Sequence, residues 1–370
     1  MTTTEPIEHD PVERSPVADL HWSQNWLVSQ RYDLLFFIGS CSLTLVFLAL
    51  FKFLVHWQFL FRFDAILITY FIFTAFLDHP HIFQTFSRTH FDPIEFKKHR
   101  WMHTGGLLGL IAIGLVLTGL GKEAEMIVAA SILGSYHIIR QHYGFLKAYK
   151  NLNRDRHPTD DWIDFGLFNT GMFACFFNDY SDAGHQVIIY GNLVSAYPQI
   201  PPVFLHLTAS AFFVFLILFV GRQIDHIRHR RALNLPKILL LAAALSTHYL
   251  VYFVAGVPFL VAEALETAYH DVQYQGWMRH YQTQRFPQIK HMASKWLAIA
   301  MIYGVVVGGL EILSLGDRPW ALWVFTPFAM LVIYHYLVDG IVWKFSHQPE
   351  LRVLFVRPPA PATAVPAESS

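Results

Sequence analysis

The segment DHPHIFQTFSR (78–88) ends an apolar run of membrane length and places two histidines inside that run. Three further apolar runs end in the same way, in SYHIIRQHYGFLK (135–147), YHDVQYQGWMR (269–279) and YHYLVDGIVWK (334–344). In each run the first histidine precedes a basic residue by nine or ten positions, which puts it roughly 14 Å inside the basic rim at helical rise. If the basic residues mark one membrane surface, one level inside the bilayer is shared by His79, His137, His270 and His335.

The composition is that of a membrane protein. Hydrophobic residues make up 54% of the 370 residues and charged residues 15%, against about 25% charged in a soluble chain. The formal net charge of +0 argues against nucleic acid as a partner. The two cysteines, Cys41 and Cys175, exclude a disulfide framework and any CxxC metal site. The 21 histidines are the unusual feature.

Hydropathy predicts an all-α fold, a polytopic integral membrane helical bundle of about ten transmembrane helices. The apolar segments are 33–56, 62–86, 105–121, 123–148, 161–178, 201–221, 236–255, 257–281, 294–314 and 319–345. The fifth is the weakest, because it contains Asp161, Asp164 and Asn169, and an interfacial helix is the alternative. Ten crossings place all the strongly basic loops on one side, which the positive-inside rule assigns to the cytoplasm. These loops are 87–104, 147–160, 222–237 and 279–295.

This topology predicts a multi-pass protein of the inner (cytoplasmic) membrane of a bacterium, with both termini cytoplasmic. Residues 1–32 form a polar N-terminal segment without the apolar core of a signal peptide. Residues 33–346 form the transmembrane helical domain. Residues 347–370 form a Pro/Ala-rich cytoplasmic tail, which we expect to be disordered.

The main hypothesis is a metal site built between helices, because ionisable groups at this depth cost several kcal/mol unless they are paired or liganded. Pro80 bends the second segment and is expected to turn His79 and His81 toward one cavity. In the fourth segment His137 is a stronger candidate ligand than His142, which is rotated by a further 100°.

The eighth and tenth segments pair a histidine with an acid one helical turn away. Glu266 and His270 share a face, an arrangement used by carboxylate-bridged di-metal sites in helical bundles. His335 and Asp339 repeat the spacing, and an intrahelical hydrogen bond is the alternative for either pair. The expected metal ligands are His79, His81, His137, His142, Glu266, His270, His335 and Asp339. We expect Tyr136, Gln141 and Tyr274 to act in catalysis and Arg140 to bind a substrate headgroup.

Other motifs add little. His99 and His103 form HxxxH, but basic neighbours disfavour cation binding there, so we interpret the pair as part of a rim that contacts headgroups. The zinc-protease HExxH, Walker A, GxGxxG and GxSxG motifs are absent.

The segments DHPH, YHxxxQHY and YHYLVD resemble the short histidine motifs of integral-membrane non-haem iron enzymes. These enzymes include fatty-acid desaturases, alkane hydroxylases and the Brp/Blh-type carotene-cleaving dioxygenases, and the resemblance is in architecture, over four of the ten segments. The desaturase HxxHH boxes are missing. The chain is also similar to an uncharacterised group of bacterial histidine-rich multi-pass proteins, through RYDLLFFIG (31–39) and the HxxQY of 270–274.

The sequence therefore favours a metal-dependent oxidoreductase with one or two iron ions, acting on a lipid, hydrocarbon or isoprenoid and supplied by an electron donor. Imidazole and carboxylate ligands suit non-haem iron, and zinc is not excluded. Three alternatives stay open: a haem-binding electron carrier, a transporter of protons or divalent metal, and a zinc-dependent lipid hydrolase. The residues do not identify the substrate.

Overall fold

The computed structural model describes residues 21–181, 186–189, 192–195, 199–316, 318–344, 348 and 351. Nearly all of the described chain is helical, which confirms the fold class. Strands occur in it only as two short pairs. A parallel pair joins β1 (Trp22–Ser23) to β4 (Leu233–Asn234), and an antiparallel pair joins β2 (Gln186–Ile189) to β3 (Asn192–Ser195). Most of the N-terminal segment and of the Pro/Ala-rich tail lies outside the described residues.

The long helical stretches coincide one for one with the segments expected from hydropathy. In the first half of the chain they are α1 (Gln30–Asp33), η2 (Leu34–Ile38), η3 (Gly39–Cys41) and α2 (Ser42–Phe61); α3 (Ala65–Phe73), η4 (Thr74–Asp78) and α4 (His79–Thr89); η5 (Met102–Gly106) and α6 (Leu107–Gly119); α7 (Glu123–Leu152); and α8 (Pro158–Tyr180). In the second half they are α9 (Val203–Arg228); α10 (Leu235–Tyr249) and η6 (Leu250–Val254); α11 (Phe259–Arg285); α12 (Met292–Leu315); and α13 (Pro319–Val342). The short α5 (Pro93–Lys98) lies between α4 and η5.

Seven of these stretches are long and apolar enough to cross a membrane, which supports a membrane protein. The other three, α7, α8 and α11, are as long but carry more polar residues, many of them buried. About ten crossings is therefore not confirmed and stays a prediction. The same holds for the side on which each terminus lies.

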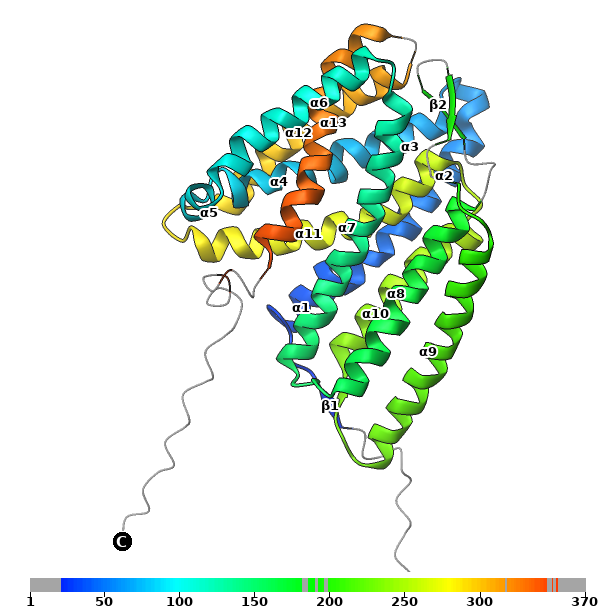
Figure 1. Cartoon of the computed structure of the whole chain (residues 1–370), viewed down its shortest axis with the longest axis vertical. Helices are drawn as coiled ribbons and strands as arrows, with labels where there is room; N and C mark the ends of the chain where they lie inside the picture. The colour runs from blue at the N-terminus through cyan, green and yellow to red at the C-terminus, as the bar shows by residue number, and fades with distance from the viewer. Residues whose placement is uncertain are drawn as a thin grey trace, which may run out of the picture.

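Two groups of helices lie at opposite ends of the molecule (Figure 1). The helices α8, α9 and α10 lie side by side at one end, and α4, α6, α12 and α13 gather at the other. Between them runs α11, which contacts both α4 and α7, and α13 contacts the same two helices. The four histidine-bearing segments therefore meet inside the bundle.

A close helix crossing fixes α4 in this arrangement. The π-helical turn η4 leads directly into α4, with Pro80 in the first turn of α4. Gly304 of α12 lies against this junction: a Cβ atom at Gly304 would come 2.2 Å from the carbonyl oxygen of Ala75 and 2.7 Å from Pro80 Cδ. Only glycine permits this approach, because backbone and a proline ring cannot move aside as a flexible side chain does.

We expect Gly304→Ala to lower the melting temperature of the purified protein, because overpacking costs about 1–3 kcal/mol. Gly309→Ala is the matched control on the same helix, since nothing lies within 4 Å of its added Cβ. Alanine is the better helix former, so the control should be unchanged or slightly stabilised. Equal melting temperatures for the two variants would contradict the tight crossing.

Candidate metal centre

Four buried histidines from four helices converge at one point: His81 of α4, His137 of α7, His270 of α11 and His335 of α13. One ring nitrogen from each lies within 4.8 Å of the others. All four side chains are buried, and the most exposed, His137, has 5% of its surface accessible. The sequence analysis placed His137, His270 and His335 at one level, with His79 instead of His81 as the fourth, and the structure brings these three together with His81.

The separation of the rings fits a metal ion. His137 Nε2 and His335 Nε2 are 3.1 Å apart, and the His81 ring centroid lies 4.4 Å from that of His335 and 4.9 Å from that of His270. Nitrogen ligands about 2.0–2.1 Å from a zinc or similar ion lie roughly 3.0–3.4 Å from one another, so the closest pair already has the spacing of ligands.

The hydrogen-bonding state of the rings supports the same interpretation. Nε2 of His81 and Nδ1 of His270 have no hydrogen-bond partner, and Nδ1 of His81 contacts Asp271 Oδ1 without making a hydrogen bond. Each buried polar atom left in this state costs about 1–3 kcal/mol. A cation coordinated by these nitrogens would remove that cost, so the donor set fits a metal that prefers imidazole.

Polar groups around the centre hold the rings in place. His335 Nδ1 lies 2.6 Å from Thr85 Oγ1, and His81 Nδ1 lies 2.9 Å from Asp271 Oδ1. A partner on the second ring nitrogen fixes the orientation of a histidine ligand and raises its basicity. Asp339 lies further from the centre, with Oδ1 at 3.7 Å from His335 Nδ1, and it is not one of the four converging groups.

Tyr274 lies beside the four rings. Its ring centroid is 4.7 Å from that of His81 and 5.4 Å from that of His335. Its hydroxyl donates to Asp339 Oδ1 at 3.1 Å and lies 3.3 Å from Thr85 Oγ1. The sequence analysis named Tyr274 as a candidate catalytic residue, and the structure places its hydroxyl at the edge of the centre.

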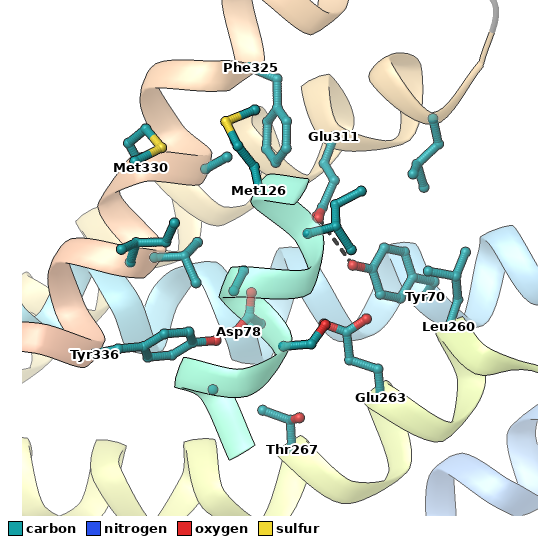
Figure 2. Close-up of a pocket in the computed structure, with 18 of the residues that line it drawn as sticks. Tyr70, Asp78, Met126, Leu260, Glu263, Thr267, Glu311, Phe325, Met330 and Tyr336 are labelled. Atoms are coloured by element: carbon teal, nitrogen blue, oxygen red, sulfur yellow. Dashed lines mark hydrogen bonds between the residues drawn. The ribbon is translucent and has the colours of Figure 1, made fainter. Parts of the chain in front are cut away.

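A cavity of about 230 Å³ opens next to the centre and reaches His81 and His270. Its walls come from α3, η4, α4, α7, α11, α12 and α13. Most of the lining is apolar, but Figure 2 shows Tyr70, Asp78, Glu263 and Glu311 turned toward the same space, with Tyr70 donating to Glu311 at 3.0 Å. An engineered cavity of about 150 Å³ holds benzene, so this one accommodates a larger apolar group.

The structure does not bring His79 and His142 into the group of four. His79 Nε2 lies 3.0 Å from Glu311 Oε2 on α12, so Pro80 does not turn His79 and His81 toward one point as expected. The His142 ring lies 5.7 Å from that of His248 and 6.2 Å from that of His270, and it is not one of the four that converge. Both are buried histidines of the surrounding structure.

The other predicted residues take different positions. Glu266 is buried and lines the cavity, and its Oε2 has no hydrogen-bond partner. Gln141 donates to the backbone carbonyl of His270 at 2.9 Å and so connects α7 to α11. Tyr136 is 58% exposed, and the exposed Arg140 lies over the ring of Tyr143, so neither contacts the four rings.

Three residues at the centre were missed by sequence reasoning. Glu311 had a readable signal, because it is an isolated acid inside an otherwise apolar segment. Asp271 follows His270 directly, so it points about 100° away from it around the helix, and it contacts His81. Thr85 had no signal, since a threonine in an apolar helix commonly bonds to its own backbone.

A second histidine group, around α5 and the start of η5, is an ion-pair network. Glu95 Oε1 lies 2.5 Å from His99 Nδ1 and 3.3 Å from His103 Nε2. The other carboxylate oxygen, Oε2, pairs with Arg88 at 3.2 Å and accepts a hydrogen bond from Gln348 at 3.1 Å. Burial alone would raise the pKa of Glu95, but the hydrogen bond with His103, the Arg88 charge and the His99 contact lower it to about 2. The expected headgroup-contacting rim is wrong for His103, which is fully buried.

No protein-family model, no curated protein and no solved structure matches this chain.

We expect Thr85→Val to weaken metal binding about 10–100-fold, because His335 loses the partner on Nδ1 while the shape of the side chain is kept. The apparent affinity can be measured by competition with a chromogenic chelator on detergent-purified protein. Thr69→Val is the control, since Thr69 is equally buried and bonds only to Ala65 of its own helix. Equal affinities for both variants would exclude an orienting role for Thr85.

We expect Glu95→Gln to destabilise the protein at pH 7 by about 3 kcal/mol, because a buried ion pair loses one partner. The folded pKa of about 2 lies below the ordinary 4.5, so this contribution is complete above pH 4.5 and is lost as the pH falls toward 2. The unfolding free energies of wild type and variant should therefore converge in that window. Glu125→Gln, which removes an exposed pair with Lys122, should change nothing at any pH.

Proposed function

We propose that this protein is a membrane-embedded, metal-dependent oxidoreductase with non-haem iron at the four-histidine centre, acting on a lipid, hydrocarbon or isoprenoid. The observation that carries the proposal is the convergence of His81, His137, His270 and His335, each from a different helix and all buried, with ligand atoms within 4.8 Å. A bound ion would compensate for the cost of burying four polar groups from separate helices.

The number of ligands favours iron over zinc. Four protein ligands complete the tetrahedron of a structural zinc site and leave no position for substrate, whereas catalytic zinc usually has three protein ligands. Iron in non-haem oxygenases accepts an octahedral arrangement, so four imidazoles leave two positions open. This argument disfavours the zinc-dependent hydrolase.

The remaining alternatives fit the contacts less well. A haem needs its two histidines on opposite faces of a wide flat ring, but the centroids of His137 and His335 are 4.6 Å apart and those of His137 and His270 are 4.9 Å apart. A transporter needs ligands that release the ion, while four nearly inaccessible imidazoles favour retention.

The surroundings supply the other requirements of the reaction. The mainly apolar cavity would bind the apolar part of the substrate beside His81 and His270 and exclude water from it. Tyr274, with its hydroxyl held by Asp339, would hold a proton at the edge of the centre. Bound iron would supply the one-electron and oxygen chemistry.

We place the centre toward the cytoplasmic side of a bacterial inner membrane, with both termini cytoplasmic. The support is that basic residues follow each of the four histidine segments, as the positive-inside rule requires. The basic loops would then face the cytoplasm, where an electron donor has access to them.

We expect detergent-purified protein to contain at least one iron per chain, measured by elemental analysis. His137→Ala and His270→Ala should each reduce the metal content at least 10-fold, because each removes one of four ligands. His248→Ala is the matched control: it is a buried histidine whose Nδ1 bonds to Ala244 and which is not one of the four. Metal-free wild type, or equal loss in the control, would refute the centre.

The redox chemistry is tested separately from metal binding. Membranes from cells expressing wild type should show oxygen-dependent lipid products by mass spectrometry that are absent with His270→Ala. Zinc as the retained metal, with product formation independent of oxygen, would contradict the oxidoreductase while leaving the metal centre intact.

A further inference from the structure

A second group of donor atoms lies next to the four-histidine centre. Asp78 at the end of η4, His81 of α4 and Asp271 of α11 each contribute one atom, and these atoms lie within 4.8 Å of one another. His81 belongs to both groups. Its Nδ1 lies 2.9 Å from Asp271 Oδ1, which leaves Nε2 as the nitrogen available to the other three rings.

The two carboxylates of this group lack adequate partners. Asp271 is fully buried, and neither of its oxygens makes a hydrogen bond; Oδ2 has no ion-pair partner among the described residues either. Asp78 makes one long ion pair, with His79 Nδ1 at 3.9 Å. Two carboxylates this close repel each other, and no lysine or arginine lines the cavity beside them.

An orienting role for Asp271 explains only part of this arrangement. A carboxylate that holds a histidine ligand needs one oxygen on one ring nitrogen, which accounts for Oδ1 and His81 Nδ1. It does not account for the unpartnered Oδ2 or for the second carboxylate, Asp78. A cation bound by all three residues accounts for both.

We propose that Asp78, His81 and Asp271 form a second metal site, which shares the imidazole of His81 with the four-histidine centre. This inference rests on the proposed function, because His81 presents Nε2 to the first ion and Nδ1 to the second. Metal–nitrogen bonds of about 2.0–2.1 Å on either side of one imidazole place the ions roughly 6 Å apart. Coordination through both ring nitrogens requires His81 to lose its remaining N–H proton to solvent and bridge as an imidazolate. Two carboxylates and a ring nitrogen suit iron, manganese or zinc, and the two carboxylates balance the charge of a divalent ion.

The second site faces the cavity. Asp78 and His81 both line it, and Figure 2 shows the Asp78 carboxylate turned into it, near the hydroxyl of Tyr336. An ion held there lies where an oxygen atom of a bound substrate can reach it. The acids Glu263 and Glu311 extend the negative wall away from the site.

The test is a metal count. Protein stripped with chelator is loaded with Fe(II) without oxygen, and in parallel with Zn(II), desalted, and analysed for metal per chain. We expect two ions per chain in wild type and one in Asp271→Asn and in Asp78→Asn. Glu263→Gln removes a carboxylate from the same cavity but outside the group, so it should keep two ions.

The outcomes separate the two proposals. One ion in wild type, lost in His137→Ala, would overturn the second site and leave the four-histidine centre standing, with Asp271 as an orienting group. No ion in wild type would overturn both. Two ions that persist in both aspartate variants would also overturn the second site. The wild-type count holds even if a variant fails to fold.

Discussion

The structure depends on how an apolar bundle accommodates buried polar side chains. Away from water, an imidazole or carboxylate without a partner costs more than a typical hydrogen bond contributes, so each such group needs a proton, a partner or an ion. In this protein the solution is local: polar residues of α4, α7, α11 and α13 face one another where these helices cross. Removing one of these polar side chains leaves the others buried without a partner. The packing of the helices and the chemistry of the site therefore depend on the same residues.

The polar interior is organised in distinct layers along α4. His81 lies at the centre, Thr85 one turn further holds His335, and Arg88 another turn on pairs with Asp92 and Glu95. The last layer is neutralised by the protein's own ion pairs, although Arg88 Nε makes no hydrogen bond. The first is not, since its rings and Asp271 keep unpartnered atoms. This contrast is the reason that a metal ion is inferred at the centre and not at Glu95, although both groups contain histidines.

Much of this arrangement could be predicted from the sequence. The constant distance from histidine to basic residue placed His137, His270 and His335 at one level, and apolar length located every long helix. The choice between His79 and His81 could not be predicted, because η4 inserts a wider turn before α4 and rotates the side chains that follow. The partners of His81 also depend on which face of α11 packs against α4. The spacing of residues within a single helix does not reveal how two helices face each other.

The same constraint explains why three of the long helices, α7, α8 and α11, are less apolar than the other seven stretches. The stretches that fall short of a membrane-spanning composition include α7 and α11, which carry two of the four converging histidines and the acids Glu263, Glu266 and Asp271. A helix surrounded by other helices need not be apolar on every face, since its polar side chains meet protein instead of lipid. The polarity that lowers the hydropathy of α11 is therefore the polarity that builds the site: sixteen of its residues are buried, among them His270, Asp271 and Tyr274.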